Sequence, residues 1–190
     1  MFSAGRLRAG ATAPGFSRRD PTRKEPLSCR LPVRQCKPPP AGRYAIDPAG
    51  SSVTFVTKHM FGLGKVRGRL KVTRSVITIA DPPEDSRVEA EVSASSFSTR
   101  NLMRDPQVRS RLFLDVRHHP AISFCSDSIR QHRGGWSVTG VLTIKGRTAP
   151  VELTVVGVSA EGAAIVFRAD CTVDRYAHGI TMMPGLAARG

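Results

Sequence analysis

The five histidines are the first residues of this sequence that could bind a metal ion or act as a general base. His118 and His119 are neighbours, so on an extended segment their side chains point to opposite faces. His59, His132 and His178 stand apart, and the sequence contains no HxH, HExxH or histidine-plus-cysteine cluster. We therefore predict no metal site, no cofactor and no catalytic histidine.

Carboxylates, serines and glycines offer no better catalytic pattern. Glu89 and Glu91 share a face, but it is the polar face of an alternating strand, where a solvated role is expected. Ser95 and Ser96 have neither a GxSxG motif nor a nearby base. Residues 62–68 are rich in glycine, yet no helix follows them to receive a phosphate group. We predict that the protein is not an enzyme.

The cysteines and the N-terminal residues bear on the cellular compartment. Cys29 and Cys36 lie in a polar segment, Cys125 and Cys171 lie in apparent strands, and no pair has CxxC spacing. Free, buried cysteines in a reducing compartment are the simplest interpretation. Residues 1–42 contain no apolar run typical of a signal peptide, so we expect a cytoplasmic protein, or a periplasmic or secreted one if its natural start differs.

The formal net charge of +14 is unevenly distributed. Residues 1–43 contain ten Lys and Arg residues against Asp20 and Glu25, together with many Pro, Gly and Ser residues. This composition predicts a disordered basic tail over residues 1–42, suited to peripheral contact with an anionic membrane surface. The basic segment 66–72 lacks interleaved aromatic residues, so we expect no specific nucleic-acid partner.

From residue 43 onward the sequence changes to short alternating segments separated by turn residues. In segment 87–94, for example, Val88 and Ala90 fall on one face while Arg87 and Glu89 fall on the other. Eight such segments predict antiparallel strands in a single domain over residues 43–190. The predicted strands are 52–58, 66–72, 76–79, 87–94, 122–129, 136–144, 151–158 and 164–173.

One short helix is predicted among these strands. Asp105 can cap its N-terminus, Pro106 suits its first position, and helical spacing continues through Phe113. Many antiparallel strands with one inserted helix predict a mostly β fold, an antiparallel barrel or sandwich. Gly140 and Gly157 interrupt two strands, where they permit either close strand packing, a bulge, or the approach of a ligand to the backbone.

Several segments also keep the order and spacing of a known family. They are 44–48 (YAIDP), 51–55 (SSVTF), 66–68 (VRG), 98–110 with its ST, RD and VRS motifs, 120–124 (PAISF), 140–146 (GVLTIKG), and 174–180 with DR and GI. Together they resemble the YceI-like, or polyisoprenoid-binding, family over residues 43–189. The resemblance implies an extended, lipocalin-like antiparallel β-barrel whose apolar channel holds an isoprenoid or fatty chain.

The expected function is therefore binding or carrying an amphipathic apolar ligand, with an isoprenoid-type or fatty-chain lipid as the partner. A hydrolase or metal enzyme on a β-barrel, and a basic nucleic-acid-binding protein, are the alternatives. Apolar residues at alternating or helix-to-barrel positions are the expected lining of the ligand site. They are Val53, Phe55, Phe97, Phe113, Phe124, Leu142, Ile144 and Phe167.

The sequence departs from the family pattern at three places. Gln107 stands where a histidine is usual, and His178 stands where an aromatic residue commonly precedes the glycine. The chain stops at Gly190, where the family runs one more strand, so the barrel is expected to lack its last strand. An open sheet edge invites pairing with another chain. We expect a homodimer through that edge, aggregation, or a tail that fills the gap.

Overall fold

The computed structural model describes residues 6–10, 39–59, 64–132, 135–161 and 164–181, which form a mostly β structure with one short α-helix. The bounds of its strands and helices follow. They are β1 (Arg6–Gly10), β2 (Gly42–Ile46), β3 (Ser52–His59), β4 (Gly64–Ile79), η1 (Pro83–Asp85), β5 (Arg87–Ser98), α1 (Arg104–Arg109), β6 (Ala121–His132), β7 (Gly135–Ile144), β8 (Arg147–Glu161) and β9 (Ala164–Cys171).

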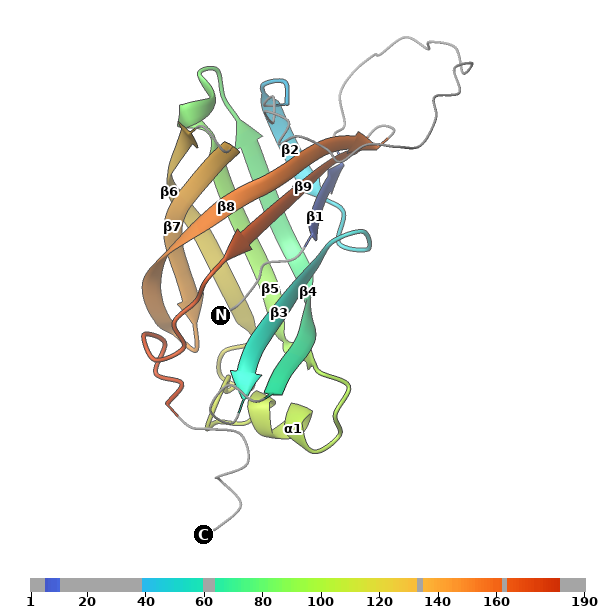
Figure 1. Ribbon diagram of the computed structural model, residues 1–190, viewed down its shortest axis with the longest axis vertical. Helices are drawn as coiled ribbons and strands as arrows, with labels where there is room; N and C mark the ends of the chain where they lie inside the picture. The colour runs from blue at the N-terminus through green and yellow to red at the C-terminus, as the bar shows by residue number, and fades with distance from the viewer. Residues whose placement is uncertain (1–5, 11–38, 60–63, 133–134, 162–163, 182–190) are drawn as a thin grey trace.

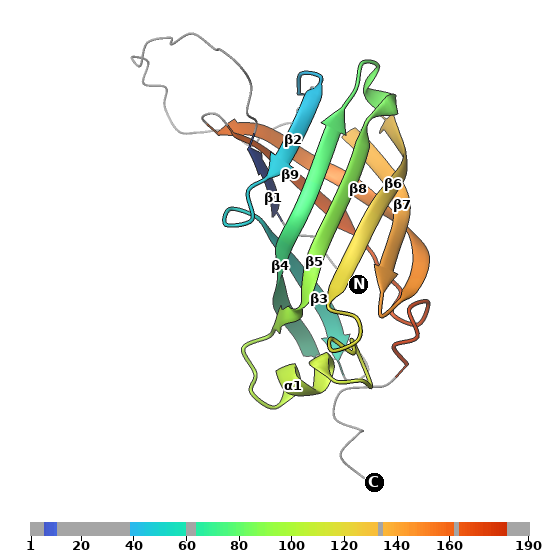
Figure 2. The same cartoon turned by 180° about the vertical axis from the view of Figure 1, so that it is seen from behind.

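The strands form one curled antiparallel sheet, which Figures 1 and 2 show from opposite sides. Strands β3 to β8 each pair with the next strand in sequence, and β1 then pairs with β9 and β2. Pairing of β2 with the second half of β4 completes the ring. The expected antiparallel barrel with one short helix is thus confirmed.

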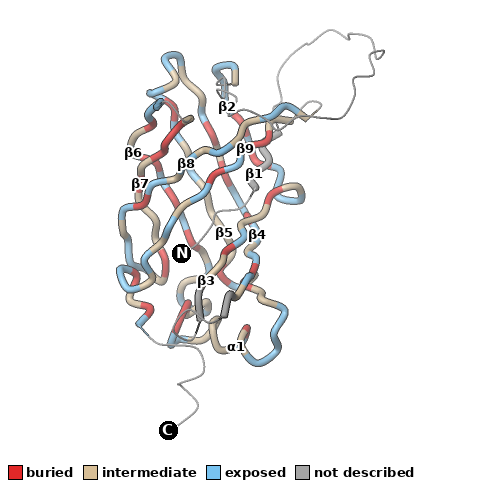
Figure 3. Tube along the Cα trace, in the orientation of Figure 1, coloured by how far each residue is buried: buried red, intermediate tan, exposed pale blue. Residues whose placement is uncertain are grey.

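The alternation of apolar and polar side chains along the strands shows which side of the sheet faces the barrel interior. In the first half of β4, Gly68 and Val72 are buried while Arg67, Arg69 and Lys71 are exposed. Figure 3 shows the same alternation of buried and exposed residues along the other strands. Because successive strand residues face opposite sides, one side of the sheet collects the apolar side chains.

Strand β4 joins two segments that the sequence predicts as separate strands. Its inward residues are even-numbered up to Val72 and odd-numbered from Ser75 to Ile77. Register shifts against β5 between Arg69 and Lys71 and between Val72 and Arg74 account for the change. Such a bulge inserts an extra residue and bends the strand, so β4 stays continuous while it pairs first with β3 and then with β2.

Helix α1 is shorter than predicted and is capped differently. Met103 is its N-cap residue, and the Asn101 Oδ1 atom accepts hydrogen bonds from the backbone N–H groups of Met103 and Arg104 at 3.1 and 2.8 Å. Asp105 lies inside the first turn, and its carboxylate bonds to Thr99 instead. The prediction of Asp105 as the N-cap, with a helix continuing through Phe113, is therefore wrong.

The N-terminal residues also differ from expectation in part. Arg6–Gly10, within the predicted disordered tail, forms strand β1 and pairs with β9 from Arg6↔Arg168 to Gly10↔Ala164. The rest of the predicted tail, residues 1–5 and 11–38, lies outside the described residues. By pairing with β9, β1 supplies hydrogen-bond partners for backbone N–H and C=O groups of β9. Without β1, these groups would face solvent or pair with another chain. Filling from the tail is one of the three outcomes expected for that edge.

The two strand glycines have structural explanations. A Cβ atom on Gly140 would collide with the Cys125 carbonyl oxygen and lie 2.8 Å from the Ser126 Cα atom, next to the register shift of β6. Gly157 lies at the register shift of β8. Close strand packing explains Gly140 and a bulge explains Gly157, so neither glycine requires a ligand near the backbone.

Candidate apolar binding site

The barrel interior contains an apolar cavity of about 90 Å³. It lies in the half of the barrel away from α1, because Trp136 and Val138 at the start of β7 line it, whereas Ile144 at the end of β7 packs near α1. Six strands and the segments before β2 and around η1 contribute to its wall. The lining residues are Pro39, Ile77, Ile79, Pro83, Ser86, Val88, Ile129, Trp136, Val138, Leu153, Val155, Val158, Phe167 and Ala169.

Strand alternation and two bulges aim these side chains at the cavity. On β8, Leu153 and Val155 point inward, and the register shift after Val155 then brings Val158 to the same side. On β6, the shift between Ser126 and Ser128 turns Ile129 inward. A simple period-two pattern loses phase at each bulge, so the inward residues beyond it change from one parity to the other.

The cavity wall carries almost no polar chemistry. Ser86 is the one hydroxyl-bearing residue among the described lining residues, and its Oγ atom accepts a hydrogen bond from the Ala80 N–H group at 3.0 Å. The buried Ser126 Oγ atom close by accepts from the Val88 N–H group at 2.8 Å. Among the described residues, no Asp, Glu, Lys, Arg, His or Cys side chain lines this cavity, so this part of the wall can desolvate an apolar group but offers no general acid or base.

The eight residues predicted to line a ligand site all belong to apolar clusters, but they do not lie together. Phe167 lines the cavity. Phe124 and Leu142 pack in the cluster that contains Trp136, and Val53 packs with Phe167 in the cluster built on β2 and β4. The remaining four residues lie at the α1 end of the barrel. They are Phe55, Phe97, Phe113 and Ile144.

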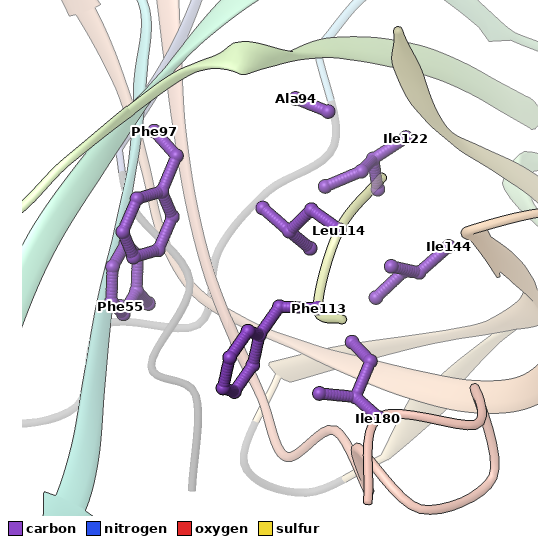
Figure 4. Packing of buried hydrophobic residues seen from close by; sticks show 8 residues of the cluster. All are labelled: Phe55, Ala94, Phe97, Phe113, Leu114, Ile122, Ile144 and Ile180. Carbon is purple, nitrogen blue, oxygen red and sulfur yellow. The ribbon is translucent and has the colours of Figure 1, made fainter. Parts of the chain in front are cut away.

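The cluster at the α1 end fills that end of the barrel. Phe55 and Phe97 stack with ring centroids 4.8 Å apart, and Phe113 and Leu114 enter from the segment after α1 (Figure 4). Ile180, from the segment after β9, completes the contact. These side chains pack on one another rather than on the cavity, so the apolar interior consists of a packed end and a hollow end.

Sequence reasoning missed most of the cavity wall. Trp136 and Val138 alternate correctly in the predicted strand 136–144, so the strand face was available as a signal. The predicted lining residues are mostly phenylalanines. Large aromatic side chains can fill the interior of a barrel by packing on one another as readily as they can line a cavity. Val158 and Ile129 follow bulges, and no pattern in the sequence predicts where these bulges lie.

His118 and His178 each lie within hydrogen-bond distance of a defined partner. The His118 Nδ1 atom lies 2.8 Å from the Asp115 Oδ1 atom, and this hydrogen bond holds the pKa of Asp115 below its ordinary value. His178 is buried, with its Nδ1 atom 2.9 Å from the Arg147 carbonyl oxygen. Among the described residues, no three His, Cys, Asp or Glu side chains gather where they could hold a metal ion.

Two of the four cysteines lie within the described residues, and both are free. Cys125 is exposed on β6, so the prediction of a buried cysteine is wrong at this position, and Cys171 is half-buried at the end of β9. Burial raises the pKa of the Cys171 thiol, and the nearby Asp170 carboxylate adds to the effect. A thiol with a raised pKa is a weaker nucleophile at neutral pH, which suits a packing role.

Comparison with known proteins agrees with this architecture. The family model described as YceI-like domain matches residues 44–189. The chain belongs to the YceI-like family. Within the described residues, no helix is long and apolar enough to cross a membrane.

Similar proteins come from several bacteria. The chain is 31% identical over 116 residues to Protein YceI of Salmonella arizonae and 30% identical over 116 residues to a UPF0312 protein of Yersinia enterocolitica. Each match covers 60% of this chain and 60% of the relative, and neither protein is named as an enzyme. The crystal structure of Burkholderia cenocepacia BcnA matches with a TM-score of 0.62 and 26% identity, covering 72% of this chain and 85% of that one.

Proposed function

We propose that this protein binds an amphipathic apolar ligand, an isoprenoid-type or fatty-chain lipid, inside the barrel. The observation that carries the proposal is the interior cavity, whose described lining residues are apolar except for the Ser86 hydroxyl and include no ionisable side chain. The proposed role is binding rather than catalysis, because such a wall holds a ligand by desolvation alone.

The size of the cavity defines how much of a lipid it takes. Its volume of about 90 Å³ is smaller than the roughly 150 Å³ of a dry protein cavity that binds benzene. The cavity therefore accepts the end of a chain, and a longer chain must displace half-buried wall residues such as Phe167 and Val158. Each isoprene unit buried contributes about 4 kcal/mol, at about 0.8 kcal/mol per carbon, before ordering costs.

The wall also determines the polarity of the ligand. The Ser86 Oγ atom already accepts a hydrogen bond from the Ala80 N–H group, so only its hydroxyl proton is left for a ligand. A charged head group inside this wall would lose its hydration without a countercharge. We therefore expect the tail to occupy the cavity and the head group to remain at the mouth or to be uncharged.

Fluorescence of Trp136, the single tryptophan of the chain, provides a direct test because its ring lines the cavity. We expect saturable changes in its emission with a C15 prenyl alcohol or a C16 fatty acid as the probe. Native mass spectrometry after mild lipid extraction should show the same ligands leaving and rebinding. Absence of saturable binding by every apolar probe in both measurements would contradict the proposal.

A cavity-filling variant distinguishes the interior from the surface. Ala169→Leu adds three carbons to the wall and should weaken binding of the prenyl alcohol about tenfold or more, because it removes space for roughly two buried methylenes. Ala160→Leu adds the same group to an exposed position on β8 and should leave affinity unchanged. Equal affinities in the two variants would place the ligand outside this cavity.

A further inference from the structure

The loop between β5 and α1 exposes two adjacent apolar side chains. Leu102 is 93% exposed and Met103 is 87% exposed, the two highest values among the large apolar residues that the structure describes. Leu112, which follows α1, is 48% exposed at the same end of the barrel. Single exposed apolar residues are ordinary on protein surfaces, but a neighbouring pair held almost fully in solvent points to a contact site.

Hydrogen bonds hold this pair outward. The Asn101 Oδ1 atom accepts from the N–H groups of Met103 and Arg104, and Asp105 bonds to both the N–H and the hydroxyl of Thr99. These bonds fix the turn on both sides of Leu102 and Met103. The two side chains are therefore exposed by a defined turn rather than by lack of structure.

The segment that carries the apolar pair is also basic. Arg100, Arg111 and Arg117 are exposed in the segment that carries α1. The two carboxylates of the segment are engaged locally, since Asp105 bonds to Thr99 and Asp115 bonds to His118. The segment thus exposes guanidinium groups, while its two carboxylates are engaged in local hydrogen bonds.

The segment after β9 adds a further residue pair to the same end. Ile180 packs in one cluster with Phe113 and Leu114, which brings this segment beside the segment after α1. Within it, Tyr176 is 56% exposed and the Arg175 guanidinium lies 4.7 Å from the centre of its ring. Tyrosine and arginine side chains are enriched where a protein meets the polar region of a membrane or an anionic surface.

The exposed turn at the opposite end of the barrel carries acidic residues. Asp81, Glu84 and Asp85 are exposed around η1, between β4 and β5. Figures 1 and 2 show this turn and α1 at opposite ends of the long axis. An anionic surface would therefore attract the α1 end and repel the η1 turn.

We propose that the α1 end, defined by residues 100–103, 111, 112, 117, 175 and 176, docks on an anionic lipid bilayer. Leu102 and Met103 enter the boundary between head groups and acyl chains, and the arginines contact lipid phosphates. Apolar tips combined with a basic rim suit this interface, in which apolar burial and attraction to anionic lipids add. The proposal is independent of the cavity ligand, because the docking residues do not line the cavity.

Vesicle co-sedimentation of the full chain tests the apolar part. The probes are phosphatidylcholine vesicles with and without phosphatidylglycerol. The double variant Leu102→Ser/Met103→Ser should bind the anionic vesicles about tenfold more weakly, as expected from the loss of two apolar side chains from the interface. Val156→Ser, an exposed apolar position on β8, is the matched control and should bind like the natural chain.

A second pair of variants tests the charges. Arg100→Gln/Arg111→Gln should weaken binding to anionic vesicles about tenfold or more and reduce its salt dependence, since each basic residue near the surface contributes about a fivefold change. Arg87→Gln/Arg130→Gln removes two exposed arginines elsewhere and should have a much smaller effect. Melting temperatures of all variants verify that each remains folded.

The basic residues of the N-terminal segment could bind the same vesicles, and the design separates the two sources. If the tail alone carries binding, the two α1-end variants will match their controls, and the docking proposal is overturned. Equal binding to neutral and anionic vesicles, or no binding to either, also overturns it. Weakening in both α1-end variants with retention in both controls supports it.

Discussion

The Asp105 carboxylate accepts hydrogen bonds from both the backbone N–H and the hydroxyl of Thr99, at 2.9 and 2.6 Å. Ser98 donates a third bond at 3.3 Å. These contacts fasten the first turn of α1 to the end of β5. The Arg109 guanidinium at the other end of the helix donates to the Phe97 carbonyl oxygen, 3.0 Å from its Nε atom. Phe113 and Leu114, in the segment after this fixed helix, then reach the barrel interior.

Replacing this carboxylate should destabilise the fold. Asp105→Asn keeps the shape of the side chain but removes its charge and one acceptor oxygen. We expect a loss of about 1.5–3 kcal/mol in the free energy of unfolding, as is typical for hydrogen bonds to a charged group. Urea unfolding of the variant and the natural chain measures this. Asp85→Asn, at an exposed position, is the control and should stay within about 0.5 kcal/mol.

The same carboxylate should make stability depend on pH. Burial by itself raises the pKa of Asp105, but the hydrogen bonds from Thr99 and Ser98 lower it more, so the pKa lies below its ordinary value of 3.8. The folded state therefore binds its proton less readily than the unfolded state. The resulting stabilisation is present above pH 3.8 and is lost as the pH falls through the folded-state value.

The measurement is the stability difference between the natural chain and Asp105→Asn across this acidic range. We expect the difference to be constant at neutral pH and to shrink below pH 3.8, because the asparagine does not titrate. A difference that grows as the pH falls would show that the pKa is raised rather than lowered.

Two strand glycines should respond differently to the same substitution. Gly140→Ala places a methyl group against the Ser126 Cα atom at 2.8 Å and the Phe124 ring at 2.9 Å, so β6 or β7 must shift. We expect destabilisation of about 1–3 kcal/mol, as for overpacking. Gly157→Ala meets nothing closer than the Arg168 Cβ atom at 4.0 Å and should be nearly neutral. Thermal unfolding of both variants distinguishes close packing from the general cost of replacing glycine.

The packed end of the barrel should depend on Phe113 more than on its neighbour. Phe113 is 3% exposed within the α1-end cluster, so Phe113→Ala should cost about 3–5 kcal/mol by leaving a cavity. Leu112→Ala alters the adjacent, 48% exposed side chain and should change stability by less than about 0.5 kcal/mol. Comparable losses in both variants would mean that the segment after α1 is misplaced.

Period-two alternation was sufficient to predict β3 and β5 to β9, but it divided β4 into two segments and gave no prediction of β1 or β2. Val88 and Ala90 face the interior from β5 while Arg87 and Glu89 face solvent, as the sequence pattern requires. Each strand face is a local property, because the pleat alone sends successive side chains to opposite sides. The family motifs, which depend only on residue order and spacing, were equally readable.

The sequence by itself determined an antiparallel barrel with an apolar interior, but the tertiary structure decided which interior residues pack and which line the cavity. Phe55 and Trp136 both point inward, yet Phe55 stacks on Phe97 while Trp136 borders the empty space. The physical reason is that a cavity is set by distances across the barrel, and bulges in β4, β6 and β8 adjust those distances. Pairing of β1 with β9 is likewise non-local, since it joins segments at opposite ends of the chain.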